Sequence, residues 1–257
     1  MARTILITSG KGGVGKTTLT SNLAVSLSYL GSKVIAVDAN LTTPNLGIHA
    51  GMYLQPNTIH DVLRGSKNLK DAIYPHAMGV SFVPASMSVE DLQDVDVGKL
   101  PEVVMGLREK ADFVLVDSAA GLGREAIAAI QAVDEVILIT NPDLPSVVDA
   151  LKTAQIAQRL NKKILGVVVN RIRGRDHEMT KENIEGMIGH SVIAEIPEDI
   201  AVSKSIAEKH PLLSYDGDSP AAFEIRKLAY QLSGIPFTPK RPKTLNILER
   251  LVNWMVG

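Results

Sequence analysis

The residues whose types and spacing most clearly indicate a chemical function form a glycine-rich run near the beginning of the chain. The run fits the pattern G-x-x-x-x-G-K-[ST] and continues one residue beyond it, as Gly10, Lys11, Gly12, Gly13, Val14, Gly15, Lys16, Thr17 and Thr18. Glycines let backbone N–H groups converge on a phosphate, while the lysine and the hydroxyl suit the β- and γ-phosphates and Mg²⁺. The run therefore predicts a nucleoside triphosphate site in which Lys16 reaches the phosphates and Thr17 ligates Mg²⁺.

A carboxylate at the end of a later apolar run supplies the expected second half of this site. Residues 113–116 are apolar and lead directly into Asp117, which we expect to hold a Mg²⁺-bound water. An acidic residue also ends many strands for structural reasons alone. Asp117 is therefore a candidate site residue only because the glycine-rich run is present as well. The small residues 118–121 form a loop whose backbone N–H groups could approach a γ-phosphate.

The elements that must position these residues alternate along the chain. Short β-branched apolar runs predict buried strands at 4–8, 33–37, 80–83, 113–116, 135–140, 163–169 and 192–196. Periodicity of about 3.6 residues predicts helices at 17–30, 125–132, 147–160 and 221–232. This alternation predicts a doubly wound α/β fold with a mainly parallel sheet, helices on both faces, and ligands beyond the carboxyl ends of the strands.

Composition restricts the class of protein. The 27 basic and 28 acidic residues nearly balance, so the charge total gives no sign of a nucleic-acid binder. The absence of cysteine removes disulfides, iron–sulfur clusters and thiolate zinc sites, which fits a reducing compartment. With neither a signal-peptide pattern nor a long apolar stretch, we expect a cytoplasmic protein that does not cross a membrane.

The sequence divides into three predicted parts. Residues 1–234 should form one nucleotide-binding domain, and residues 235–243 a linker that carries Pro236, Pro239 and Pro242. Residues 244–257 should form a last, amphipathic segment.

The run from Lys11 to Thr18 resembles the deviant Walker A motif of the MinD/ParA family. The likeness extends over nearly the whole chain, through residues 37–38, 117–121, 141–142, 169–171 and 196–199. Among the branches of the family, the sequence most resembles MinD, a membrane-associated ATPase that positions cellular machinery. The resemblance implies hydrolysis of ATP to ADP and phosphate, which resets the protein.

The resemblance also implies roles for particular residues. Lys11 would cross a two-fold interface to the phosphates of the partner subunit, which predicts an ATP-dependent homodimer; a solvated loop lysine is the alternative. Asp38 would belong to the Mg²⁺ water shell. The adenine would be recognised by Asn170, with Arg171 beside the base and backbone around Pro197 and Glu198, although Asn170 could instead cap a loop.

The chain departs from the MinD pattern at Asn40. The pattern after the second strand is Asp, any residue, Asp, and its later Asp orients the attacking water; here residues 38–40 read Asp-Ala-Asn. Asparagine can hold a water but cannot accept its proton. Because phosphoryl transfer depends chiefly on positioning, we expect slow hydrolysis. A nucleotide-dependent adaptor that does not hydrolyse ATP is an alternative. Asn45 matches the switch asparagine of the family.

The last segment separates apolar from polar residues when it is drawn as a helix. The predicted membrane-facing residues are Leu245, Ile247, Leu248, Leu251, Val252, Trp254 and Met255. Basic residues in the linker and the likeness to the MinD membrane-targeting helix favour reversible binding to the inner face of the cell membrane. Two such helices on a dimer would bind far more strongly than one. Docking on the protein's own core or on a partner helix remains the alternative.

Other functions compete with this interpretation. A ParA-like DNA-partition ATPase would need basic surface, for which Arg171, Arg173 and Arg175 are the local candidates. Nucleic acid is nevertheless not the partner that we expect; we expect protein partners whose identity the sequence does not reveal. The six histidines lack metal-ligand spacing, and no role is assigned to them.

Overall fold

The structure is a computed structural model in which residues 2–238 are described. Within that range a single sheet of eight strands forms, in the order β3-β4-β2-β5-β1-β6-β7-β8. All neighbouring strands are parallel except β3, which pairs antiparallel with β4 at one edge. The strands are β1 (Arg3–Thr8), β2 (Val34–Ala39), β3 (Tyr74–Pro75), β4 (Val80–Val83), β5 (Phe113–Ser118), β6 (Glu135–Thr140), β7 (Lys163–Ile172) and β8 (Val192–Pro197).

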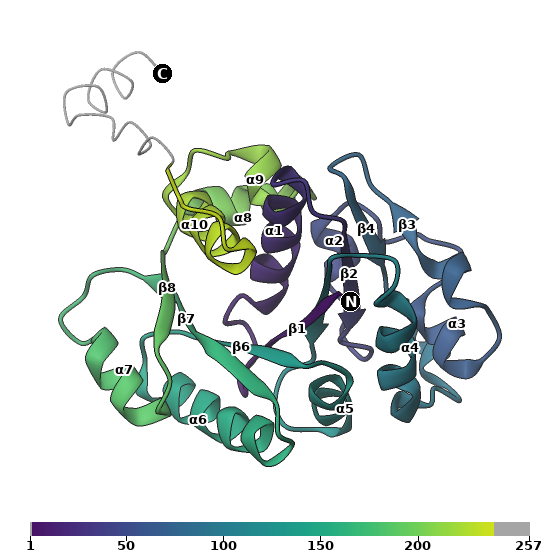
Figure 1. Ribbon diagram of the computed structural model, residues 1–257, viewed down its shortest axis with the longest axis horizontal. Helices are drawn as coiled ribbons and strands as arrows, with labels where there is room; N and C mark the ends of the chain where they lie inside the picture. The colour runs from purple at the N-terminus through teal and green to yellow at the C-terminus, as the bar shows by residue number, and fades with distance from the viewer. Residues whose placement is uncertain (1, 239–257) are drawn as a thin grey trace.

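Helices cover both faces of this sheet (Figure 1). They are α1 (Lys16–Tyr29), α2 (Leu46–His49), α3 (Ile59–Arg64), α4 (Leu100–Leu107), α5 (Arg124–Ala132), α6 (Leu144–Arg159), α7 (Lys181–Ile188), α8 (Ile200–Ala207), α9 (Leu212–Tyr215) and α10 (Pro220–Ser233). Three short 3₁₀ turns lie at Leu69–Ala72, Val89–Leu92 and Val97–Lys99. The doubly wound α/β fold predicted from the sequence is confirmed.

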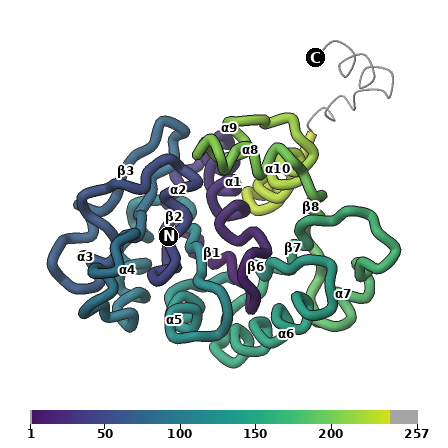
Figure 2. The backbone as a smooth tube through the Cα atoms, turned by 180° about the vertical axis from the view of Figure 1, so that it is seen from behind, coloured from purple at the N-terminus to yellow at the C-terminus, as the bar shows by residue number. Residues whose placement is uncertain are grey.

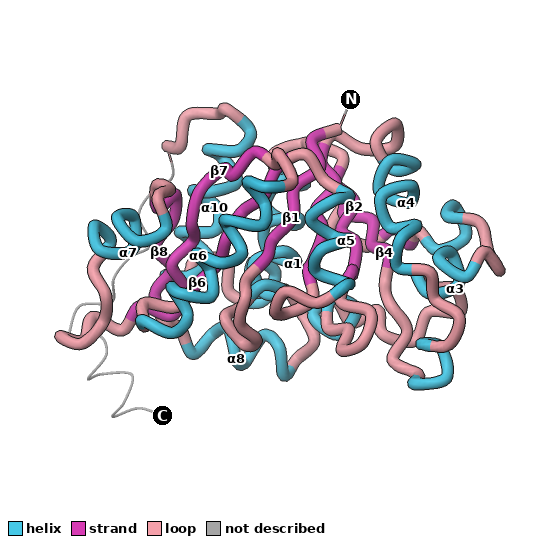
Figure 3. Tube along the Cα trace, turned by 90° about the horizontal axis from the view of Figure 1, so that it is seen from below, coloured by secondary structure: helices cyan, strands magenta, loops and turns pink. Residues whose placement is uncertain are grey.

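Two apolar layers hold the helices to the sheet. Alternate residues of β1 show the division: Leu6 belongs to the layer under α3 to α7, while Ile5 and Ile7 belong to the layer under α1, α2 and α8 to α10. The inner strands β1, β2, β5 and β6 are buried almost throughout, as expected of parallel strands covered on both faces. Figure 2 shows the helix layers from behind, and Figure 3 shows the strands running between them.

All seven predicted strands are present, with boundaries that differ by a few residues. Strand β2 extends to Ala39 and β5 to Ser118, so Asp38 and Asp117 are the second-last residues of their strands and do not follow them. Strand β7 continues to Ile172, past the predicted end at residue 169. Strand β3 and the shorter helices have too few residues to give a periodic pattern, and the sequence did not predict them.

The first residues of the predicted linker pack against the domain. Helix α10 ends at Ser233 and is capped by Gly234, and Phe237 lies in edge-to-face contact with Phe223 and Tyr230 of that helix, with ring centroids 5.3 and 5.0 Å away. The predicted membrane-facing residues 245–255 lie outside the described part of the chain. Among the helices of residues 2–238, none has the length and apolar character that crossing a bilayer requires.

Candidate functional site

The glycine-rich loop joins β1 to α1 with two residues in the left-handed region. Gly13 has a φ of 75° and Gly15 a φ of 103°, angles that residues with a Cβ rarely adopt. Helix α1 begins at Lys16, and neither a side-chain cap at Gly15 nor an acidic residue in the first turn engages its free N–H groups. These N–H groups and the positive end of the helix therefore remain available to a phosphate.

Close neighbours also require glycine at two positions of the loop. A Cβ on Gly10 would lie 2.5 Å from the backbone oxygen of Asp149 in α6, and a Cβ on Gly15 would overlap the side-chain amide of Asn170. The loop is thus wedged between α6 and the end of β7. Any side chain at Gly10 would displace backbone and not merely another side chain.

Asn170 and the other predicted adenine-site residues come together. A cavity of about 250 Å³ is lined in part by Asn170, Arg171, Pro197 and Glu198. The Asn170 Nδ2 donates a hydrogen bond of 2.7 Å to the backbone oxygen of Val14, so this side chain also braces the phosphate loop. Arg171 lines both this cavity and the neighbouring one at the phosphate loop. Recognition of adenine by these residues stays a prediction.

Asp38 and Asp117 lie side by side at the carboxyl ends of β2 and β5. They are cross-strand partners, and both are fully buried. The Thr17 hydroxyl donates to Asp117 Oδ2 at 2.6 Å. Asp38 accepts three backbone hydrogen bonds, from Asn40, Asn45 and Leu46 at 3.1, 3.1 and 2.9 Å.

The electrostatics of this pair fit a divalent cation. Burial raises the pKa of Asp117 to about 6, against the lowering effects of the Thr17 hydroxyl and the Lys16 charge. Burial, followed by the charge of Asp117, raises the pKa of Asp38 well above its usual value. Two adjacent buried carboxylates repel each other, and a hydroxyl beside them completes a set of oxygen donors that suits Mg²⁺. A cation here would offset both the burial and the repulsion.

The two lysines of the loop occupy different places. Lys16 is buried and lines a cavity of about 270 Å³ together with Thr17, Thr18 and Asn40. Burial lowers the pKa of Lys16, with the charge of Asp117 opposing this. Lys11 is half-exposed and is not among the residues that line this cavity; its Nζ donates to the Ser146 hydroxyl at 3.1 Å and lies 3.5 Å from Asp143 Oδ1. Lys11 is therefore held by the start of α6 on its own subunit.

Asn40 lines the same cavity, but its amide is engaged within its own loop. The side-chain Nδ2 donates to the backbone oxygen of Thr43, and the Thr43 hydroxyl donates to Asn40 Oδ1 at 3.0 Å. Asn40 therefore lies at the cavity of the phosphate loop, and its place beside bound phosphates stays a prediction. A contact with an attacking water stays a prediction.

The structure brings two further residues to the site. The Thr20 hydroxyl, which donates to the Lys16 backbone oxygen at 3.0 Å, also lies 3.4 Å from Asp117 Oδ1, and its spacing of three residues from Thr17 within a helix could have revealed it. His49 lines the phosphate cavity, and burial lowers its pKa to about 4. His49 sits at the end of the four-residue helix α2, which gave no pattern in the sequence.

Comparison with known proteins agrees with this geometry. Residues 5–212 match the CobQ/CobB/MinD/ParA nucleotide binding domain. An ATP-binding protein of Methanocaldococcus jannaschii, described as uncharacterized, is 37% identical over 100% of this chain and 98% of its own length. MinD of Pyrococcus horikoshii, solved in complex with Mg-ADP, is 37% identical with a TM-score of 0.87, covering 90% of this chain and 96% of that one.

A third relative was solved as a complex. The MinC:MinD cell division complex of Aquifex aeolicus contains a chain that is 30% identical with a TM-score of 0.83, covering 94% of this chain and 99% of that one. The phosphate loop, the paired carboxylates and these relatives together lead to one conclusion: the chain belongs to the CobQ/CobB/MinD/ParA family of nucleotide-binding proteins, within which it is similar to MinD.

Proposed function

We propose that this protein is a MinD-like switch that binds Mg·ATP, forms a homodimer in the ATP state, and is reset by slow hydrolysis to ADP and phosphate. The observation that carries the proposal is the separation of the two lysines. Lys16 lines the proposed nucleotide cavity, whereas Lys11 does not line it and makes a half-exposed contact with Asp143. A lysine that its own site does not use is available to a second subunit.

The residues that would hold the nucleotide are those of the loop and the neighbouring cavity. The N–H groups at the start of α1 and the Lys16 ammonium would bind the phosphates, while Asn170 and Arg171 would lie beside the base. Thr17, Asp117 and the water shell around Asp38 would hold Mg²⁺, which supplies charge neutralisation for the triphosphate. The Mg-ADP complex of the Pyrococcus relative supports this assignment.

The reaction places a specific demand on Asn40. Its amide would orient the attacking water by hydrogen bonds, but to do so it must give up at least one of its contacts with Thr43. This requirement and the missing carboxylate both favour slow turnover. They also favour the second candidate function, an adaptor that binds ATP without hydrolysing it.

We expect Asn40→Asp to raise the ATP turnover number by about tenfold or more, because a carboxylate accepts the proton of the water and no longer donates to the Thr43 carbonyl. Steady-state phosphate release measures this, with Asn183→Asp on the exposed surface of α7 as the control. An unchanged or lower rate would place the attacking water elsewhere. If the wild type also releases no phosphate in a single turnover, the adaptor is the correct function.

The proposed output is reversible attachment to the inner face of the cell membrane through residues 244–257, where the dimer recruits or positions protein partners. The amphipathic sequence and the preceding Lys240, Arg241 and Lys243 support this. Attachment would be weak for one subunit and strong for two, since the second segment binds at high effective concentration.

We expect liposomes that contain anionic lipid to sediment the protein with a non-hydrolysable ATP analogue at least tenfold more than with ADP, given the usual gain from bivalent binding. Deletion of residues 244–257 should abolish sedimentation while leaving the ATP-dependent dimer intact by light scattering. Equal sedimentation in the two nucleotide states, or none lost on deletion, would refute the membrane mechanism. A salt-sensitive shift of DNA with ATP would instead support a ParA-like role.

A further inference from the structure

In the loop that follows β2, side chains bind both the backbone N–H and the backbone carbonyl of Leu41. The Leu41 N–H donates to Glu125 Oε2 at 3.0 Å, and the Leu41 carbonyl accepts from His60 Nε2 at 3.2 Å. Leu41 directly follows Asn40, whose own N–H is bound by Asp38. Besides Asp38, side chains from two different helices, α5 and α3, therefore hold the backbone next to Asn40.

Glu125 gathers three donors from this loop. Besides the Leu41 N–H, its carboxylate accepts the Thr42 N–H at 3.4 Å and the Thr42 hydroxyl. Glu125 is the second residue of α5, which begins seven residues after Asp117. One carboxylate thus links the Asn40 loop to the first turn of α5, the helix that follows strand β5.

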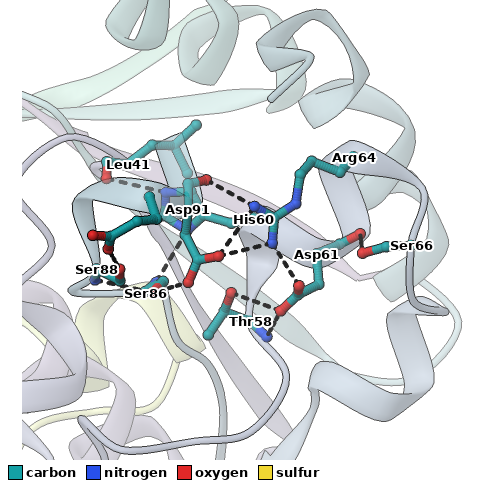
Figure 4. A network of polar contacts seen from close by, with 10 residues as sticks. Leu41, Thr58, His60, Asp61, Arg64, Ser66, Ser86, Ser88 and Asp91 are labelled. Atoms are coloured by element: carbon teal, nitrogen blue, oxygen red, sulfur yellow. Dashed lines mark hydrogen bonds and ion pairs between the residues drawn. The ribbon is translucent and has the colours of Figure 1, made fainter. Parts of the chain in front are cut away.

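His60 is a rigid anchor on the other side. It is fully buried, and its Nδ1 accepts the Ser86 N–H at 3.0 Å, so the proton must lie on Nε2 for the bond to Leu41 (Figure 4). Burial lowers the pKa of His60, which keeps the ring in this neutral form. The Ser86 hydroxyl in turn donates to Asp91, and Arg64 pairs with Asp91 at 3.0 Å.

We propose that Glu125 and His60 are positioning residues for ATP hydrolysis, which together fix the Asn40 loop beside the phosphates. The inference rests on the proposed ATPase function and deepens it. The Asn40 amide makes hydrogen bonds only to Thr43 of the same loop within residues 2–238, so its own contacts cannot fix where the loop stands. Asp38 constrains the loop through the N–H groups of Asn40, Asn45 and Leu46, and the hydrogen bonds of Glu125 and His60 add a constraint at Leu41 and Thr42, between those points. Through α5, Glu125 also ties the loop to the segment that follows Asp117.

The full-length variant Glu125→Ala tests this role. We expect kcat for ATP to fall about tenfold, which corresponds to a loss of about 1.4 kcal/mol of transition-state stabilisation, while KM for ATP and the affinity for ADP change less than twofold. Hydrogen exchange at the Leu41 and Thr42 amides should accelerate. Glu125→Gln should recover part of the rate because its amide oxygen still accepts one N–H. Glu102→Ala, which removes an exposed glutamate in the first turn of α4, is the matched control.

A double-mutant cycle separates positioning from general loss of structure. Thr42 is exposed, so Thr42→Ala should leave folding intact, and its effect on kcat should be smaller when Glu125 is already alanine. His60→Gln, which keeps a donor toward the Leu41 carbonyl, should retain more activity than His60→Ala.

The outcomes distinguish this inference from the function on which it rests. An active wild type whose kcat is unchanged in Glu125→Ala, or unaltered amide exchange at Leu41 and Thr42, would overturn the positioning role alone. An equal loss of ADP affinity and kcat would overturn it as well, because that result indicates a damaged nucleotide site. A wild type without any ATPase activity would overturn both the role and the proposed hydrolysis.

Discussion

Asp117→Asn is expected to raise the thermal stability of the nucleotide-free protein while eliminating its stabilisation by Mg·ATP. Burial raises the pKa of Asp117 from 3.8 to about 6, so at neutral pH the folded state carries a carboxylate that it holds unfavourably. Raising the pKa of a buried carboxyl from 3.8 to about 6 corresponds to roughly 3 kcal/mol. Removing that cost should raise Tm by about 5 to 10 °C in a chain of this length.

The direction of the pH dependence follows from the same shift. Because the pKa of Asp117 is higher in the folded than in the unfolded state, the folded protein binds this proton more tightly. The stability that the protonated Asp117 contributes to the folded state is fully present below pH 3.8 and is lost as the pH rises through about 6. The stability advantage of Asp117→Asn should therefore be large at pH 7 and small at pH 4. Thermal melts at the two pH values, without nucleotide and with EDTA, measure the difference.

The functional cost of the same substitution should be severe. An asparagine oxygen can still accept from the Thr17 hydroxyl, but it offers no charge to Mg²⁺, so we expect ATP turnover to fall about a hundredfold or more. The Tm increase that Mg·ATP gives the wild type should disappear. Asp176→Asn, an exposed change in the loop after β7, controls for charge. A variant that melts below the wild type without nucleotide, or that keeps the Mg²⁺-dependent shift, would contradict this account.

Lys11→Ala should abolish the ATP-dependent dimer while changing ATP affinity by less than about tenfold. Lys11 lies outside the cavity that contains Lys16, so its loss should spare binding within one subunit. Light scattering with a non-hydrolysable ATP analogue should show a monomer. Lys70→Ala, at an exposed position remote from the loop, should dimerise like the wild type.

Removing the contact of Lys11 with Asp143 should have the opposite effect on dimerisation and so provides a second test. Both side chains are more than 40% exposed and 3.5 Å apart, so the pair contributes about 1 kcal/mol at most and restrains Lys11 only weakly. Asp143 also caps α6 by accepting the Ser146 N–H. Asp143→Ser keeps a good capping residue and removes the charge, so it should allow dimerisation at a lower ATP concentration. A dimer of unchanged ATP dependence in Asp143→Ser, or a persistent dimer in Lys11→Ala, would remove Lys11 from the interface.

The sequence predicted the parts of the site that lie close together along the chain. The glycines, Lys16 and Thr17 form one continuous run at a strand-to-helix junction, and Asp117 ends an apolar strand, so local pattern and chemistry were sufficient. Parallel pairing of β2 with β5 then brings Asp38 beside Asp117, as expected at the carboxyl edge of a sheet.

The contacts that the sequence did not predict join distant segments. The Glu125 carboxylate reaches Leu41 across 84 residues, and the Lys11 ammonium reaches Asp143 across 132. Such contacts depend on which helix covers which strand, and no periodicity within either segment encodes that. Short helices such as α2 and α9 likewise form where tertiary packing stabilises them, since four residues have no helical preference of their own.

The packing of Phe237 on α10 determines how far the chain can extend from the domain. Because that ring packs against Phe223 and Tyr230, only residues 238–243 are left as a tether before residue 244. Six residues span at most about 20 Å even when fully extended. Any surface that residues 244–257 bind must therefore come within that distance of α10, which limits the angles at which the molecule can approach it.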